Sequence, residues 1–296
     1  MRTNTGQILY IPRIGQRADF QHPLMKGCLG WWPLTDGAGG IAKDLVGGNN
    51  GVQAGGVTRI DTELGRASSF DGVDGRLDVT NLGGHDPYTT ATTLSMWCYL
   101  RSDVKEQYFF NKSNSAGTSV GFFGWITSAT ASGDLELKLY DTSSGLTVAK
   151  TFDGLATQIL DRWANIVFIS AGPDFTLASN LDVYVDGVLQ TATSARDGDG
   201  FTSEEASGVL SIAGRTTDNL RNIDADFHNV RFWNRALSSS EVLELYQNPW
   251  AGLSMPSETR YFFLSSPPPT INPFSRIITS STILNKSGKT VIRRGA

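Results

Sequence analysis

Apolar and polar residues alternate repeatedly through the middle of the chain. Residues 94–100 place Leu, Met, Cys and Leu at every second position, and residues 135–140 alternate leucine with Glu, Lys and Tyr. Successive side chains of a strand point to opposite faces of a sheet, so each segment can give one face to a core. The pattern predicts half-buried β-strands.

A dipeptide turn signal joins two further apolar runs. Asp186-Gly187 separates residues 181–185 from residues 188–189, and Asp-Gly in this setting is typical of a two-residue hairpin. Clusters of Gly, Asp, Asn and Ser separate the other strand-like segments. We expect these further strands near residues 28–34, 66–70, 76–80, 107–112, 120–127, 163–170, 209–213 and 227–233.

One helix is expected near the end of this region. Ser238 with Glu241 three residues later matches a capping box, and apolar residues follow before Pro249. Many short strands without amphipathic helices between them indicate antiparallel packing. The predicted fold class is all-β: an antiparallel two-sheet jelly-roll sandwich with one short C-terminal helix and extended N- and C-terminal arms.

Length and composition suggest one domain with appendages. A chain of 296 residues suits one large core, and 32 glycines with only 18% charged residues favour short strands and turns over a helical bundle. Residues 267–269 are three prolines, which favour a stiff extended segment. We therefore divide the chain into a basic N-terminal arm at 1–26, a sandwich at 27–250 and a basic extended tail at 251–296.

Charge separates the body of the chain from its ends. Residues 1–26 carry a net charge of +3 and residues 251–296 one of +5, which leaves −12 on residues 27–250 within the total of −4. We expect the ends to bind an acidic surface on neighbouring subunits. The candidate partner-binding residues are Arg2, Arg13, Arg17, Arg260, Arg276, Lys286, Lys289, Arg293 and Arg294.

Other partners and compartments are less favoured by the sequence. A body of net charge −12 repels phosphate, so nucleic acid is not expected as a partner. No apolar run approaches 18 residues, so no membrane partner is expected and we predict a soluble protein. Cys28 and Cys98 each stand among apolar residues, and two buried thiols or one disulfide would explain them.

Five short segments, in a fixed order, carry a resemblance to a known family. They are GCLGWWPLTDGAG at 27–39, AKDLVGGNNG at 42–51, SFDGVDGRLDV at 69–79, LDVYVDGVL at 181–189 and VRFWNRALSSSEVLELY at 230–246. In this order they resemble laminin-G-like domains of the concanavalin-A-like lectin/glucanase superfamily. HPLMKGCLGWW at 22–32 and YQNPW at 246–250 also resemble a subset found in tailed-bacteriophage virion proteins.

The resemblance implies a jelly roll that often binds carbohydrate or protein and often holds one calcium ion at its rim. Asp44, Asn50 and Gly51 match the family segment that can supply calcium with carboxylate and carbonyl oxygens. The same residues would equally shape a turn. His228-Asn229 stands where many relatives have Asp-Glu, which removes potential anionic ligands.

The superfamily also contains β-glucanases, which place carboxylates in the pattern E-x-D-x-x-E on one strand, because a nucleophile and an acid must flank one glycosidic bond. This sequence lacks that run. Its three histidines show no metal-ligand spacing, and it has no G-x-S-x-G elbow. We therefore predict that the protein is not an enzyme.

Candidate ligand-binding residues are aromatic or acidic. Trp125 and Tyr88 could offer flat faces to a sugar, and Asp71 and Asp74 could give polar contacts, although aromatic residues of sandwiches usually lie in the core.

Two functions follow as hypotheses. The first is a structural virion protein, a head decoration or cement subunit that forms homo-oligomers, is held to capsid or tail subunits by its arms, and is synthesised in the host cytoplasm. The second is a glycan-binding adhesin of a phage tail or receptor-binding device.

Overall fold

A computed structural model describes residues 16–36, 39–63, 65–80, 82–113, 121–127, 133–140, 147–172, 174–198, 208–216 and 221–254, together with two short strands near the end. The chain divides into two units, residues 1–256 and residues 257–296. In the second unit, β18 (Thr282–Leu284) pairs antiparallel with β19 (Thr290–Ile292).

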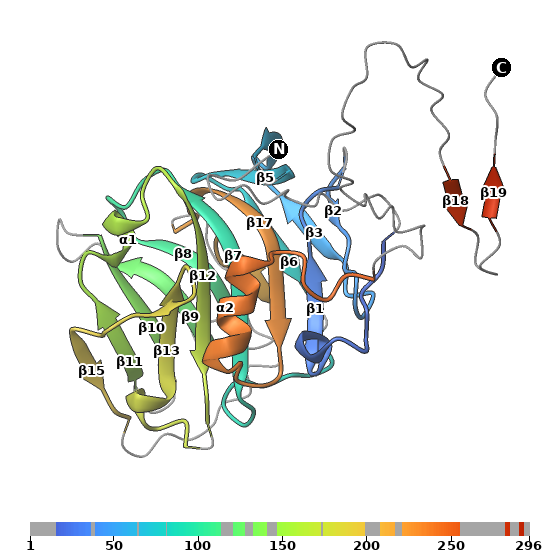
Figure 1. Cartoon of the computed structure of the whole chain (residues 1–296). Helices are drawn as coiled ribbons and strands as arrows, with labels where there is room; N and C mark the ends of the chain where they lie inside the picture. Colours follow the sequence, from blue (N-terminus) through green and yellow to red (C-terminus); the bar gives the residue numbers. More distant parts are fainter. Residues whose placement is uncertain are drawn as a thin grey trace, which may run out of the picture. The chain divides into compact units, whose positions relative to one another are not determined.

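Within the described residues, two antiparallel sheets form the first unit (Figure 1). One sheet contains β1 (Cys28–Trp32), β4 (Thr58–Thr62), β5 (Gly65–Asp71), β7 (Thr92–Leu100), β12 (Trp163–Ser170), β13 (Leu181–Val185), β14 (Val188–Leu189) and β17 (Asp224–Trp233). The other contains β2 (Ile41–Ala42), β3 (Gly51–Ala54), β6 (Arg76–Val79), β8 (Gln107–Ser113), β9 (Gly121–Thr127), β10 (Asp134–Tyr140), β11 (Thr147–Phe152), β15 (Ser194–Arg196) and β16 (Leu210–Ile212).

The order of the strands makes this a sandwich. The eight-stranded sheet runs β14-β13-β12-β7-β17-β5-β4, with β1 paired to β17, and the nine-stranded sheet runs β15-β11-β10-β9-β8-β16-β6-β3-β2. The predicted fold class, an antiparallel two-sheet sandwich with one short C-terminal helix, is confirmed. A second helical turn that the sequence did not suggest, α1 (Leu155–Gln158), follows β11.

The main core lies between the two sheets. The alternating apolar residues of β7 and the leucines of β10 belong to one buried cluster, as the period of two predicts. Gly124 on β9 lies where an added Cβ would stand 2.8 Å from ring carbons of both Phe110 and Phe168. The absence of a side chain at this position lets the aromatic rings of the core close over the strand.

The predicted hairpin is confirmed in its details. Asp186 has a φ of 52° and Gly187 a φ of 80°, and a type I′ turn requires positive φ at both positions. The Asp186 carboxylate accepts the backbone N–H of Asn165 at 2.9 Å and pairs with Arg162 at 2.7 Å. The turn therefore connects β13 to β14 and is also fastened to β12.

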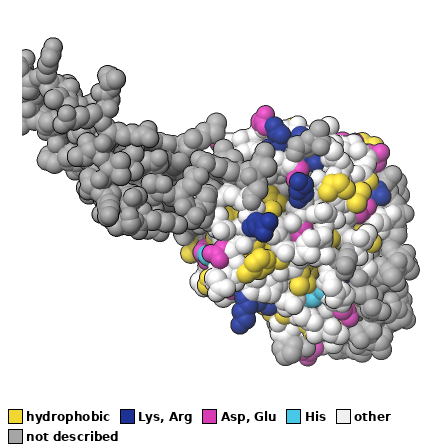
Figure 2. All heavy atoms as spheres, turned by 90° about the vertical axis from the view of Figure 1, so that its right-hand side faces the viewer, with side chains coloured by type: hydrophobic (Ala, Val, Ile, Leu, Met, Phe, Trp, Pro, Cys, Tyr) yellow, Lys and Arg dark blue, Asp and Glu magenta, His cyan; other side chains and the backbone are white. Residues whose placement is uncertain are grey.

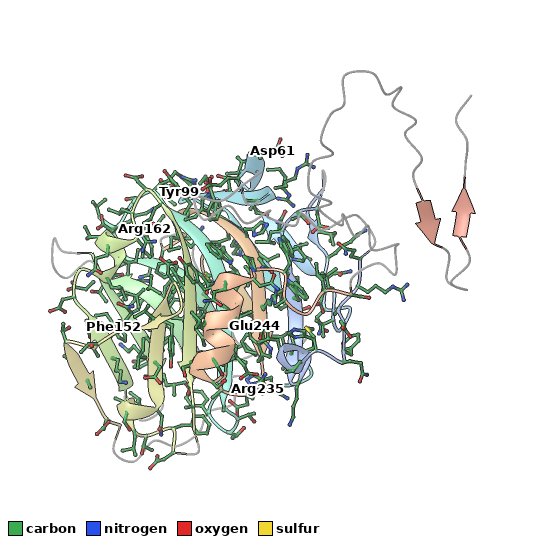
Figure 3. All side chains as sticks on the ribbon, viewed as in Figure 1. Asp61, Tyr99, Phe152, Arg162, Arg235 and Glu244 are labelled. Carbon is green, nitrogen blue, oxygen red and sulfur yellow. The ribbon has the colours of Figure 1, made fainter. Side chains whose placement is uncertain are left out.

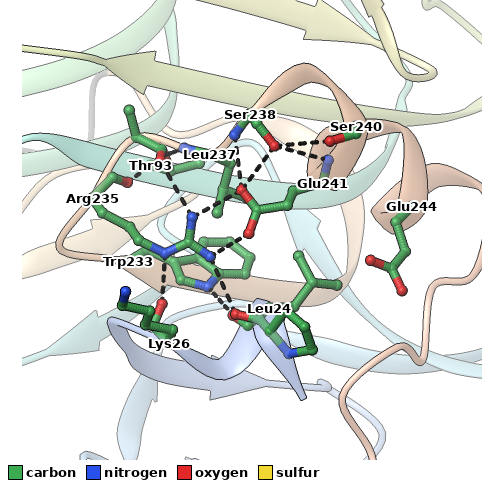
Figure 4. A network of polar contacts seen from close by, with 12 residues as sticks. Leu24, Lys26, Thr93, Trp233, Arg235, Leu237, Ser238, Ser240, Glu241 and Glu244 are labelled. Atoms are coloured by element: carbon green, nitrogen blue, oxygen red, sulfur yellow. Dashed lines mark hydrogen bonds and ion pairs between the residues drawn. The ribbon is translucent and has the colours of Figure 1, made fainter. Parts of the chain in front are cut away.

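The helix α2 (Ser239–Gln247) covers the outer face of the eight-stranded sheet (Figure 1). Ser238 and Glu241 form the predicted capping box, and Glu241 also pairs with Arg235 at 2.6 Å. Arg235 donates to the Lys26 carbonyl at 2.6 Å, so the same network reaches the N-terminal segment (Figure 4). Figure 3 labels Glu244 on this helix and Arg235 just below it.

The two ends of the sandwich meet beside the helix. Ala18 bridges Leu253, the Asp19 N–H donates to the Gly252 carbonyl at 2.7 Å, and the Ser254 N–H donates to the Arg17 carbonyl at 2.8 Å. The 3₁₀ helix η1 (Pro23–Met25) is packed beneath them, with Leu24 completely buried. The chain therefore enters and leaves the sandwich at adjacent points.

These contacts correct the predicted boundaries. Residues 16–26 do not form an arm, because they belong to a second buried cluster with α2, and the sandwich extends to residue 254. Ala18, Leu24 and Met25 show no period and become buried through contacts with residues distant in sequence, whereas Phe20 stays exposed. Among the candidate partner-binding residues, only Arg17 is described, and it is exposed. The others lie outside the described residues: Arg2, Arg13, Arg260, Arg276, Lys286, Lys289, Arg293 and Arg294.

The two cysteines lie on opposite sides of the eight-stranded sheet. Cys98 belongs to the main core, Cys28 belongs to the second cluster, and both are free thiols. Burial raises the pKa of Cys28 to about 12, so this thiol stays protonated at neutral pH. Of the two interpretations that the sequence allowed, the structure shows the buried thiols. Among the described helices, none has the length and apolar character that a membrane span requires.

Candidate functional site

Asp44, the central residue of the predicted calcium site, organises its own loop. One carboxylate oxygen accepts the N–H groups of Trp31 and Val46, and the other accepts those of Gly47 and Asn49, at 2.8 to 2.9 Å. An ionised carboxylate has about four acceptor positions, so these donors fill it. The geometry fits the turn interpretation and does not offer Asp44 to a metal ion.

The other two residues of the predicted calcium site have structural roles as well. The Asn50 side chain accepts the Asp44 N–H at 3.0 Å. A Cβ at Gly51 would stand 2.4 Å from a Leu77 methyl carbon, so this position needs glycine for packing. Among the described residues, no group of three His, Cys, Asp or Glu side chains is placed to hold a metal ion.

Two of the predicted sugar contacts also shape a turn. Asp71 accepts the N–H groups of Val73, Asp74 and Gly75 at 2.9 to 3.2 Å, and Asp74 accepts that of Gly56 at 2.6 Å. Partial burial raises the pKa of Asp71, but the backbone donors outweigh it and hold the pKa below its usual value. The hydrogen bonds accepted by Asp71 and Asp74 account for the conformation of this loop without a bound ligand.

Tyr88 is not available to a ligand. Its side chain is 4% exposed, packs in the main core and donates its hydroxyl to the Tyr140 carbonyl. The prediction that Tyr88 binds sugar is therefore wrong. A loop residue shows no periodicity, so the sequence could not indicate that its ring turns inward.

Trp125 is the predicted aromatic ligand contact that stays partly exposed. It stands on β9 between the core residues Phe122 and Ile126 in the alternating pattern, so it points to the outer face of the nine-stranded sheet. Its ring stacks on Tyr108 at 5.6 Å and meets Phe123 edge to face at 6.1 Å.

Neighbouring strands complete a cluster around Trp125. The Trp125 Nε1–H donates to Glu136 at 2.6 Å, and the Lys138 Nζ lies 5.8 Å from the Trp125 ring centroid and 5.4 Å from that of Tyr140. Glu136 and Lys138 are themselves 3.8 Å apart. We call the set Tyr108, Phe123, Trp125, Glu136, Lys138 and Tyr140 the outer-face cluster.

Polar residues extend the same face toward the other edge of the sheet. Phe123 is in register with Asn111, Asn111 with Ser211, and Ser211 with Asp78. The Ser211 hydroxyl donates to Asp78 at 2.8 Å, and Arg76 pairs with Asp78 at 2.8 Å. Asn111 and Ser211 are each 2% exposed, so the groups of this face that a ligand could reach are the half-buried ones around Trp125 and the Arg76–Asp78 pair.

The sequence contained part of the signal for this cluster. The leucines of residues 135–139 define the core face of β10, so Glu136, Lys138 and Tyr140 had to share the opposite face. Pairing of β10 with β9, and of β9 with β8, could not be deduced from periodicity. Tyr108 and Phe123 were therefore missed.

A comparison with protein families supports the two-sheet sandwich fold described above. The family model described as concanavalin A-like lectin/glucanases superfamily (Laminin_G_3) matches residues 71–243, more than half of the chain. The chain belongs to this superfamily. A search of the curated proteins finds no match.

Solved structures with a similar fold include the receptor binding domains of botulinum neurotoxins and the binding domain of a mosquitocidal protein. The receptor binding domain of botulinum neurotoxin C/D mosaic serotype has a TM-score of 0.54 at 16% identity, over 75% of this chain and 51% of that one. The receptor binding domain of botulinum neurotoxin D gives 0.53 at 13%, over 78% and 57%. The binding domain of Paraclostridial Mosquitocidal Protein 1 gives 0.54 at 15%, over 75% and 52%. This chain spans about half the length of these domains, and the likeness concerns the fold alone.

Proposed function

We propose that the sandwich is a non-enzymatic carbohydrate-binding domain and that the outer-face cluster contacts the glycan. The observation that carries this proposal is the aromatic group around Trp125. The helix α2 and both ends of the sandwich cover the other sheet, whereas on the nine-stranded sheet Trp125, Glu136, Lys138 and Tyr140 stay half-buried around the buried rings of Tyr108 and Phe123. Membership of a lectin-like superfamily and the likeness to receptor-binding domains support a binding role.

The chemistry of the cluster favours binding over hydrolysis. Glycosidases need two carboxylates about 5 to 10 Å apart, flanking the scissile bond. The outer-face cluster contains one carboxylate, Glu136, which is engaged by Trp125 and Lys138. Tyr108 stacks on the Trp125 ring and the Lys138 Nζ lies over it, so a sugar would contact the exposed part of that ring while Lys138 donates to its hydroxyl groups.

Trp125→Ala in the full chain tests the proposal. Loss of a stacking ring costs about 0.5 to 1.5 kcal/mol in addition to the free energy of the buried area, so we expect binding to fall roughly tenfold or more on a glycan array. Trp163→Ala is the matched control, because Trp163 is also half-buried but lies on β12 of the other sheet. An array signal that Trp125→Ala leaves intact, or silence from the wild-type chain, would contradict the proposal.

A second proposal concerns attachment to a larger assembly. We infer that the tail binds other virion subunits, of a capsid or of a tail, with the sandwich presented outward. Two observations favour it: residues 257–296 form a unit of their own, and the two ends of the sandwich leave it side by side. On the described part of the face in Figure 2, basic side chains are interspersed with acidic ones, so the basic character needed for an acidic partner comes from the terminal segments.

Deleting residues 257–296 tests this second proposal. The truncated chain should keep the unfolding midpoint of the sandwich, because the division into units falls at residue 256. It should no longer sediment with phage particles, whereas the full chain should. Association that survives the deletion would exclude the tail as the anchor.

A further inference from the structure

The strands at the edges of the two sheets differ in length. The eight-stranded sheet ends at β14 and β4, and the nine-stranded sheet ends at β15 and β2. β14 and β2 have two residues each and β15 has three, whereas β4 has five. β1 also has five residues, but the loop of Asp44 covers its second side through hydrogen bonds to the N–H and carbonyl of Trp31. Among the described residues, β5 is the strand that pairs with β4, so β4 presents the longest edge.

The main chain of β4 directs every second residue toward this edge. In an antiparallel pair, opposite residues alternate between pairs that exchange N–H···O bonds and pairs that do not. Thr62 and Gly65 close a two-residue loop and are therefore a bonded pair, and so is the pair of Ile60 with its neighbour on β5. The N–H and C=O groups of Arg59 and Asp61 then point away from β5. The backbone hydrogen bonds described outside the strand ladders use none of these groups.

The sequence of β4 is symmetric about its middle residue. It reads Thr-Arg-Ile-Asp-Thr over residues 58–62. A two-fold axis would place this strand antiparallel to itself, with outward groups paired to outward groups. One such register sets Arg59 opposite Arg59, another sets Asp61 opposite Asp61, and the third, centred on Ile60, sets Arg59 opposite Asp61. Like charges directly opposite destabilise a strand pair and opposite charges stabilise it, so the centred register is favoured.

The side chains of β4 fit this pairing. Charges on an edge strand usually discourage another strand from pairing with it. The Asp61 carboxylate, labelled at the top of Figure 3, is 87% exposed and lies 3.3 Å from Arg66. The acceptors described for the Arg59 side chain are neutral oxygens, among them the Asp36 carbonyl at 3.3 Å and the Gln53 amide. Asp61 of a second copy would give Arg59 a carboxylate, which only the centred register provides.

We propose that β4 is a dimerisation strand, which pairs antiparallel with β4 of a second copy of this chain about a two-fold axis at Ile60. Each Arg59 exchanges two main-chain hydrogen bonds with the Asp61 opposite, and the side chains of the same residues form an ion pair. The two eight-stranded sheets become one continuous sheet. The contact is short, so the association is weak and reversible. It presents two copies of every other surface, which raises avidity toward a multivalent partner, and it does not depend on the functions proposed above.

Charge reversal within β4 of the full chain tests the ion pairs. Sedimentation equilibrium should show a monomer–dimer equilibrium for the wild type. Asp61→Arg sets arginine opposite arginine, and Arg59→Asp sets aspartate opposite aspartate, so each should weaken self-association at least tenfold. An equimolar mixture of the two variants should form a heterodimer as strong as the wild-type dimer, because every charge again faces its opposite. Arg196→Asp, an exposed charge on the edge strand β15, is the matched control and should have no effect.

A cysteine on the axis tests the register. In the centred register the two Ile60 residues face each other with Cα atoms about 4.5 Å apart, within reach of a disulfide. Ile60→Cys should therefore give a covalent dimer with oxidised glutathione. Thr58→Cys lies on the same face, but its counterpart is four residues out of register, about 14 Å away, so this variant should stay unlinked. Cys28 and Cys98 are buried and should not compete.

The outcomes that count against the dimerisation strand are equally specific. A chain that sediments as a monomer at every concentration would overturn it, as would a dimer that both charge reversals leave intact or variants whose mixture does not associate. Equal crosslinking of Ile60→Cys and Thr58→Cys would exclude the centred register. These cysteine variants keep the charges of β4, so they decide the question even where Arg59→Asp unfolds through loss of its bond to Gln53.

Discussion

Replacing His228 with leucine should leave the sandwich folded at pH 7 and remove much of its loss of stability in acid. His228 lies on β17, completely buried, with its ring edge against Trp250 at a centroid distance of 5.1 Å. Neither ring nitrogen has a hydrogen-bond partner among the described residues. Burial and the neighbouring charge of Arg231 lower the pKa of His228 to about 3.

The direction of the pH effect follows from this depressed pKa. Between pH 6.5, the ordinary histidine value, and pH 3, the unfolded chain binds a proton at this residue that the folded chain excludes. The free energy of unfolding therefore falls as the pH falls through this window, by about 1.4 kcal/mol per pH unit and by on the order of 5 kcal/mol in total. His85, with a pKa of about 4, acts in the same direction between pH 6.5 and pH 4.

Urea unfolding of wild type and His228→Leu at pH 7, 6, 5 and 4 would measure this. The two curves of stability against pH should diverge below pH 6.5, with the variant flatter. Ile166→Val, which trims a buried side chain of the same sheet, should shift the curve at all pH values and keep its slope. Equal slopes in wild type and His228→Leu would show that His228 does not titrate on unfolding.

The strand positions could be predicted because local chemistry and burial agree. The alternation in residues 94–100, the Asp186-Gly187 turn and the Ser238 capping box each encode their structure within a few residues. Such signals do not depend on which strand becomes the neighbour. The order of the strands in each sheet is set by contacts between residues distant in sequence, which no local pattern encodes. The sandwich topology was therefore expected only from the resemblance to a family.

The candidate sites were harder to predict, because the availability of a side chain to a ligand depends on its burial and on its hydrogen-bond partners. Asp44 has the composition of a metal ligand, and only the four N–H groups pointing at it show otherwise. Tyr88 and Trp125 were equivalent as exposed aromatic candidates, yet one lies in the core and the other on an outer face. His228 was noticed only as a missing ligand, although its burial makes it important for stability.

Arg231→Met should destabilise the sandwich by about 3 kcal/mol and loosen its C-terminal segment. Arg231 is 1% exposed and has no carboxylate among the acceptors described for it. It donates to the Ala251 carbonyl at 2.8 Å, to the Pro249 carbonyl and to the Asn229 side chain at 3.3 Å. Its guanidinium lies 3.6 Å from the centroid of the Trp31 ring.

Two opposing terms decide the size of this effect. Burial lowers the pKa of Arg231 to about 9, so the side chain remains charged at pH 7, and removing a buried charge is favourable in itself. The substitution also removes a desolvated cation–π contact, about 2 kcal/mol, and takes from the buried Ala251 carbonyl the donor described for it, at about 1 to 3 kcal/mol. The Asn229 side-chain oxygen and the Pro249 carbonyl keep donors from Trp31 and Asn229. The losses exceed the gain, because methionine cannot donate to any of the three.

Denaturant unfolding and amide hydrogen exchange would separate the global effect from the local one. Faster exchange in Arg231→Met should concentrate in residues 249–254 and in residues 16–19, which bridge them. Arg66→Met is the matched control, since its pair with Asp61 on the surface is 3.3 Å long and partly exposed, where such pairs contribute about 0 to 1 kcal/mol. If Arg231→Met were as stable as Arg66→Met, the buried cation would not be what holds the two ends of the sandwich together, and the aromatic contacts of Trp250 would have to do so alone.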